Sequence, residues 1–87
     1  MAELDILIGK RLQQARKALG FKSARSFARK HAIPESTYSQ HETGKRSLNP
    51  TILLSYCERL NIHPGWLILG TAQEPVKQEQ KELVTAE

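Results

Sequence analysis

The sequence predicts an all-α fold of five short helices around one small core. Apolar residues recur at the three- and four-residue spacing of amphipathic helices, capping residues precede these runs, and glycines follow them. The 87 residues are 39% hydrophobic, which suffices for one domain, and the lone Cys57 cannot form an internal disulfide. With no apolar run of membrane-spanning length and no leader pattern, we expect a cytoplasmic protein.

The first two helices are marked by an apolar stripe and by a capping serine. The stripe comprises Leu4, Ile8, Leu12, Ala15 and Leu19. Gly20 is expected to end the first helix, because glycine is common just beyond helix ends. Ser23 is expected to cap the second helix, which continues through Phe27 and ends near His31 or Ala32.

A third helix is expected from about Pro34 to Thr43. Proline suits a first helical turn, where its missing N–H would lack a partner anyway, and Gly44 can close the last turn. Tyr38 is the obvious inward side chain of this segment, and most of its other residues are polar. The third helix is therefore predicted to expose most of its surface.

The remaining helices begin at two further cap-and-proline signals. Asn49 and Pro50 start the fourth helix, whose predicted buried face comprises Ile52, Leu53, Tyr56, Cys57 and Leu60. Residues 62–64 open a very short fifth helix, which holds Trp66 and ends at Gly70. We therefore predict a helical domain over residues 4–70 and a polar tail over residues 71–87.

The charge is distributed unevenly along the chain. Residues 1–70 contain 11 Lys or Arg and 5 Asp or Glu, whereas residues 71–87 contain 2 and 4. A basic body favours an anionic partner, and nucleic acid is the first candidate because contacts to phosphates dominate its binding.

The junction between the second and third helices indicates how such a partner would be bound. The turn at residues 31–33 is too short for antiparallel stacking, so the two helices are expected to cross at a large angle, as in a helix-turn-helix. The outward side chains of the third helix suit base edges and phosphates; they are Glu35, Ser36, Thr37, Ser39 and Gln40. Lys45, Arg46 and Ser47 follow where a loop can run beside the sugar-phosphate backbone.

Three stretches in this order resemble one family. They are "RKALG" (16–20), "SFARKHAIPESTYSQHETGKR" (26–46) and "LNIHPGWLILG" (60–70). On these marks, residues 8–71 resemble the phage-repressor and Cro-type (XRE-like) helix-turn-helix family, with the λ-repressor-like fold. His41 departs from the family pattern, which frequently has an apolar residue there.

The resemblance implies particular roles. Arg16 and Glu42 would form a structural salt bridge between the first and third helices. Glu35, Ser36 and Gln40 match base-reading positions, and the positions near phosphates are Ser23, Arg25, Lys45 and Arg46. Lys22 is also expected to bind DNA. Leu69 lies where the family often has a polar residue, so with Ile68 it is a candidate dimer contact or a cover for the base of the tail. We favour the dimer, because one recognition helix reads few base pairs and two-fold symmetry is expected.

Other chemistries fit the residues poorly. The histidines and Cys57 lack the close pairs of a zinc site, so we expect no metal and no cofactor. Ser36, His41 and Glu42 lie within two turns of one helix without a nucleophile turn, so we expect no enzyme. Cys57 is expected to be buried and inert, and whether Glu35 selects cytosine or only caps its helix is left open.

These observations predict a sequence-specific, repressor-like regulator of transcription that binds double-stranded DNA and represses or activates by where it sits. Its recognition helix, about residues 34–43, would enter the major groove, and the protein would bind as a homodimer. An alternative is an antitoxin that binds DNA in the same way and also binds a partner toxin through residues 71–87 or its N-terminal arm.

Overall fold

A computed structural model of the protein describes residues 2–71, which form five α-helices and no strand. The helices are α1 (Ala2–Ala18), α2 (Ala24–Lys30), α3 (Glu35–Thr43), α4 (Pro50–Leu60) and α5 (Pro64–Leu69). The predicted all-α fold is confirmed. Apart from Thr71, the predicted tail lies outside the described residues, and the division of the chain at residue 70 stays a prediction.

The helix ends have the local chemistry that the sequence indicates. The Ser23 side chain accepts a hydrogen bond from the Ser26 N–H, and the Asn49 side chain accepts one from Ile52. His63 caps α5 in the same way, through the Gly65 N–H. Pro34 differs slightly from expectation, because it is the residue before α3 rather than part of its first turn.

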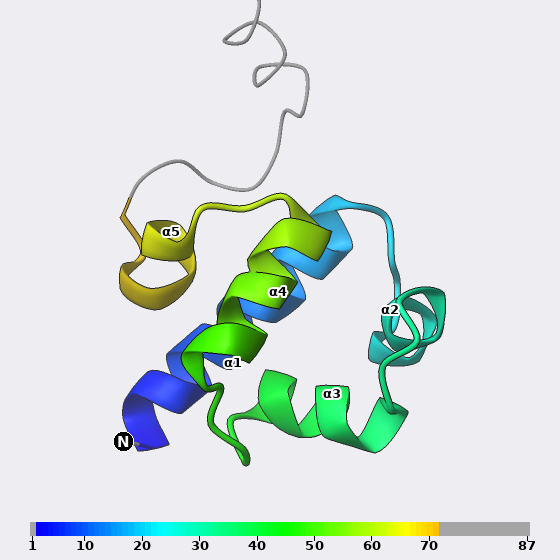
Figure 1. Ribbon diagram of the computed structural model, residues 1–87, viewed down its shortest axis with the longest axis horizontal. Coiled ribbons are helices and arrows are strands. Elements are labelled where there is room, and N and C mark those ends of the chain that lie inside the picture. Colours follow the sequence, from blue (N-terminus) through cyan, green and yellow to red (C-terminus); the bar gives the residue numbers. More distant parts are fainter. Residues whose placement is uncertain (1, 72–87) are drawn as a thin grey trace, which may run out of the picture.

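The five helices surround a single core. In Figure 1, α1 and α4 cross the centre, α2 and α3 lie towards one side, and α5 lies towards the other. Each helix contributes a fully buried side chain: Leu12, Phe27, Tyr38, Leu60 and Leu67. Because every helix buries an apolar face in the same core, the position of each one depends on all the others.

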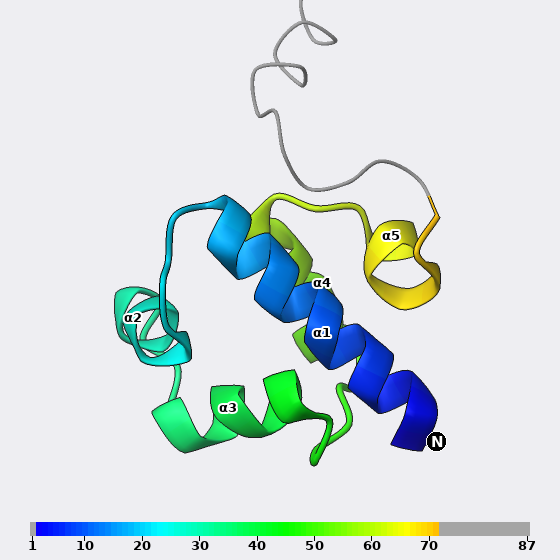
Figure 2. The ribbon, with the colours of Figure 1, turned by 180° about the vertical axis from the view of Figure 1, so that it is seen from behind.

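Most of the predicted apolar stripe of α1 is buried, but its first member is not. Ile8, Leu12 and Ala15 are buried and Leu19 packs against the core, whereas Leu4 is 39% exposed. The physical reason is the length of α1, since 17 residues extend about 25 Å. Its first turn therefore projects beyond the helices that cover the rest (Figure 2).

Two glycines allow α1 to approach the end of α3 closely. A Cβ atom on Gly9 would lie 2.8 Å from the His41 carbonyl oxygen and 2.7 Å from the Glu42 carbonyl carbon. Gly44 ends α3 with a φ of +82°, and a Cβ there would meet Ile6 of α1. The crossing of α1 and α3 thus depends on the absence of two side chains.

Candidate nucleic-acid interface

Helix α3 lies along one edge of the molecule, with α1 and α4 on one side of it. Figures 1 and 2 show that no other helix within residues 2–71 covers the opposite side. Tyr38, His41 and Glu42 are buried, at the i, i+3 and i+4 spacing of one helix face. The remaining residues of α3 are exposed or half-buried, and they form a polar surface.

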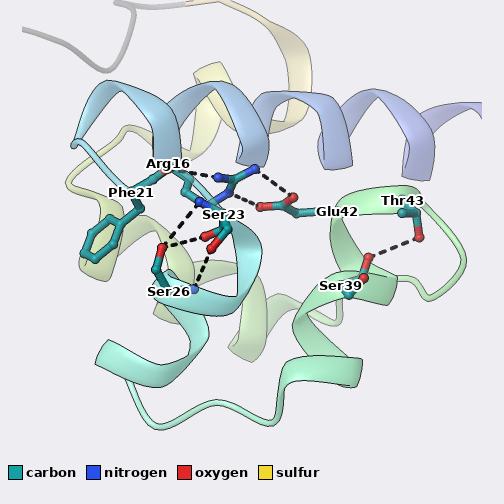
Figure 3. Close-up of polar contacts among 7 residues, drawn as sticks. All are labelled: Arg16, Phe21, Ser23, Ser26, Ser39, Glu42 and Thr43. Atoms are coloured by element: carbon teal, nitrogen blue, oxygen red, sulfur yellow. Dashed lines mark hydrogen bonds and ion pairs between the residues drawn. The ribbon is translucent and has the colours of Figure 1, made fainter.

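An ion pair fixes the buried side of α3 to α1. Arg16 Nε donates to Glu42 Oε2 at 2.7 Å, Nη2 donates to Oε1 at 3.3 Å, and Nη1 donates to the Phe21 carbonyl oxygen at 2.9 Å (Figure 3). The two side chains are only 6% and 5% exposed. The structure therefore brings together the two residues that the resemblance suggested as partners, and the pair links α1, the α1–α2 turn and the end of α3.

His41 links α3 to α4 on the same buried side. Its Nδ1 lies 2.7 Å from the Tyr56 hydroxyl, and its buried Nε2 has no hydrogen-bond partner within the described part of the chain. Burial, followed by the charge of Arg46, lowers the pKa of His41, so the ring is neutral at neutral pH. The family position that is frequently apolar is thus occupied here by a buried polar group that binds a tyrosine.

Serine and threonine hydroxyls form local hydrogen bonds to the backbone in α2 and α3. Ser23 and Ser26 form a reciprocal capping box at the start of α2 (Figure 3). Thr43 donates to the Ser39 carbonyl oxygen at 3.1 Å, near the end of α3 (Figure 3). These bonds stabilise the start of α2 and lie within the last turns of α3.

Glu35, in the first turn of α3, is paired with two arginines of α2. Its Oε2 accepts from Arg29 Nε at 3.0 Å and from Arg25 Nε at 3.3 Å. The hydrogen bond from Arg29 is the main reason that the pKa of Glu35 is lowered, so the carboxylate is ionised at neutral pH. Sequence reasoning included Arg25 but missed Arg29, although the i, i+4 spacing of the two arginines places them on one helix face.

The predicted DNA-binding residues lie on α2, on α3 and in their flanking loops. Most are exposed: Lys22, Ser23, Arg25, Glu35, Ser36, Ser39, Lys45, Arg46 and Ser47. Thr37 and Gln40 are half-buried. The Ser47 hydroxyl donates to Asp5 Oδ2 at 2.8 Å, a contact to α1 that the sequence did not indicate.

This part of the chain holds a concentrated positive charge. Residues 22–47 contain six Lys or Arg and two Glu, and one of the two, Glu42, is neutralised by Arg16 from outside the segment. The cations are Lys22, Arg25, Arg29, Lys30, Lys45 and Arg46, and all are exposed. A polar helix flanked by exposed cations matches the requirements of a DNA interface, in which side chains meet bases and cations meet phosphates.

The histidines and the cysteine that were considered for metal binding lie at helix ends or in the core. His31 ends α2 and its ring lies 4.5 Å from that of Phe27, His63 caps α5, and Cys57 is buried. Within residues 2–71, no three His, Cys, Asp or Glu side chains are grouped so as to hold a metal ion. No helix in the described range has the length and apolar character needed to cross a membrane.

The candidate dimer contacts lie on α5, away from α3 (Figure 1). Leu69 is 68% exposed, the highest value among the large hydrophobic residues that are exposed, and Ile68 is half-buried. Arg11 was missed by sequence reasoning: its Nη1 donates to the carbonyl oxygens of Leu67 and Ile68, at 3.2 and 2.9 Å. A cation at the carboxyl end of α5 holds this helix against α1.

Comparison with protein families gives one match. A family described as a helix-turn-helix domain matches residues 9–73, which is well over half of the chain. Comparisons with curated proteins and with solved structures give no significant match. The matched range contains α2, α3 and every side chain of the polar, basic surface described above.

Proposed function

Because this chain belongs to the helix-turn-helix domain family, we propose that it is a sequence-specific transcriptional regulator that binds double-stranded DNA and acts as a repressor. The observation that carries the proposal is the two-sided construction of α3. Tyr38, His41 and Glu42 fix one side in the core, and the other side is polar and is not covered by another helix of the described residues. Such a helix can enter the major groove without rearrangement of the domain.

Two kinds of contact would follow from this placement. Ser36, Ser39 and Gln40 carry donors and acceptors that can meet base edges. The loop cations Lys45 and Arg46 would contact phosphates, with Lys22 and Arg25 contributing on the other side of α3. The protein would repress transcription by occupying its site, without chemistry of its own and in the cytoplasm.

We further propose that two copies bind together, through α5. Leu69 is exposed and Ile68 is half-buried, on a helix distant from α3, so an α5 contact would leave both recognition helices free. Two-fold symmetry would present two half-sites about one helical turn apart. Leu69→Ser should weaken dimerisation, measured by sedimentation, while the fold is retained.

Selection of bound sites from a random duplex library tests the central proposal. A specific regulator should enrich one sequence, with two similar half-sites at fixed spacing. Recovery of no enriched sequence would overturn the proposed function.

A substitution then tests the role of α3. Gln40→Ala should weaken binding to the selected site by roughly 1–3 kcal/mol and relax the preference at one base pair. Gln14→Ala, the same change at an exposed position of α1, is the matched control and should leave binding unchanged. Equal losses for Gln40→Ala on every duplex would contradict a base-reading role.

The antitoxin alternative places the toxin contact in the N-terminal arm or in residues 71–87, of which only Thr71 is described. Copurification of a second protein from the source organism would favour it, whereas a plain regulator should be isolated alone.

A further inference from the structure

Resting on the function proposed above, we propose that Glu35, oriented by Arg25 and Arg29, selects a cytosine in the operator by accepting a hydrogen bond from the N4 amino group. The two arginines act as positioning residues, and Glu35 is the specificity-determining residue. The cytosine would lie in the major groove, opposite the first turn of α3.

The geometry of the three side chains gives the two carboxylate oxygens of Glu35 different roles. Oε2 accepts from both arginines, at 3.0 and 3.3 Å, whereas Oε1 has no hydrogen-bond partner among residues 2–71. The Glu35 side chain is 43% exposed, so a ligand can reach the carboxylate. Oε2 is thus used to orient the side chain, and Oε1 remains available to accept a hydrogen bond.

An ionised carboxylate can only accept hydrogen bonds, and this restricts the bases that it can contact. In the major groove cytosine presents an amino donor, whereas thymine O4 and guanine O6 and N7 are acceptors that would repel the carboxylate. Adenine has an amino donor, but its N7 acceptor lies beside it. Cytosine is therefore the base that Glu35 favours most.

The arginines remove the electrostatic obstacle to an acidic residue at this position. A lone carboxylate facing DNA would be repelled by phosphates, but the group of Arg25, Arg29 and Glu35 carries a net charge of +1. Each guanidinium uses only its Nε on Glu35, so its two Nη nitrogens remain for phosphate oxygens.

Stabilisation of the fold explains this arrangement poorly. Both arginine side chains are 65% exposed, and ion pairs between such exposed groups contribute little to stability. An arrangement of three charged side chains across α2 and α3, on the surface proposed to meet DNA, fits recognition better than folding.

The test uses the full chain and the duplex that wild-type protein selects. Each C·G pair of a half-site is replaced in turn by T·A, A·T and G·C, and affinities are measured for wild type, Glu35→Gln and Glu58→Gln. The affinity of wild type should fall about tenfold or more when one particular C·G pair is replaced. Glu35→Gln should abolish that preference or shift it towards adenine, because glutamine pairs with adenine N6 and N7. Glu58→Gln, an exposed change on α4, should retain it.

A double variant separates orientation from direct contact. Arg25→Gln with Arg29→Gln leaves the carboxylate in place without its partners, so the same C·G preference should fall while preferences at other base pairs persist. Thermal unfolding checks that each variant is folded.

The failures are distinguishable. Absence of any selected sequence for wild type overturns the proposed function and this inference with it. If wild type is selective but Glu35→Gln has the same base preferences, the inference alone is overturned. The same holds if Glu35→Gln changes the affinity equally on all duplexes.

Discussion

The substitution Gly9→Ala provides a severe test of the packing of α3. Gly9 lies in α1, and alanine would normally favour a helix over glycine by about 1 kcal/mol. Local propensity therefore predicts a more stable protein. The tertiary structure predicts the opposite, because a Cβ at this position would meet the backbone of His41 and Glu42.

The magnitude follows from the distances. Ordinary contact with a Cβ begins near 3.4 Å, whereas the Glu42 carbonyl carbon would be at 2.7 Å and the Glu42 carbonyl oxygen would be closer still. Helices α1 and α3 must therefore separate by more than the difference of 0.7 Å. Neither partner is a flexible side chain that can move aside. Overpacking of this kind costs about 1–3 kcal/mol or somewhat more, and the upper end applies to a contact between backbones. After subtraction of the gain in propensity, we expect a net destabilisation of about 2 kcal/mol.

Thermal and urea unfolding measure this effect, and a domain of this size should lose roughly 8–16 °C in Tm. Lys10→Ala is the control, because it also places an alanine in α1, at the exposed position next to Gly9. This control should be nearly neutral. An unchanged or raised Tm for Gly9→Ala would refute the close approach of α1 to α3.

Three further changes have definite expected outcomes. Glu42→Gln leaves the Arg16 charge buried and should destabilise the fold by about 3–5 kcal/mol in urea unfolding; a loss below about 1 kcal/mol would contradict a buried pair. Because burial lowers the pKa of His41 from 6.5, the unfolded state binds more protons below that pH, so stability should fall on acidification. His41→Leu should reduce that slope between about pH 6.5 and pH 5, and an unchanged slope would exclude His41 as the responsible group. Lys45→Ala should weaken binding to all duplexes and reduce the salt dependence by about one unit of slope, whereas an intact slope would remove Lys45 from the phosphate contacts.

The helices and their ends could be predicted from the sequence because they depend on neighbouring residues. Ser23 and Asn49 cap helices through bonds to residues only three positions away. The burial of Tyr38 on an otherwise polar segment followed from its being the obvious apolar side chain there. Helical periodicity and capping are local properties, and they determined that residues 35–43 form an exposed helix.

The tertiary structure decided which residues from distant segments meet. The approach of Gly9 to α3, the bonds from Arg11 to α5 and the pair of His41 with Tyr56 join residues that are 15 or more positions apart. Glu35 is the sharpest case, because its chemistry in isolation allowed either a helix cap or a base contact. The crossing of α2 over the start of α3 brings two arginines to one of its oxygens. Such contacts depend on the relative positions of whole helices, which packing of the common core determines and which no local pattern specifies.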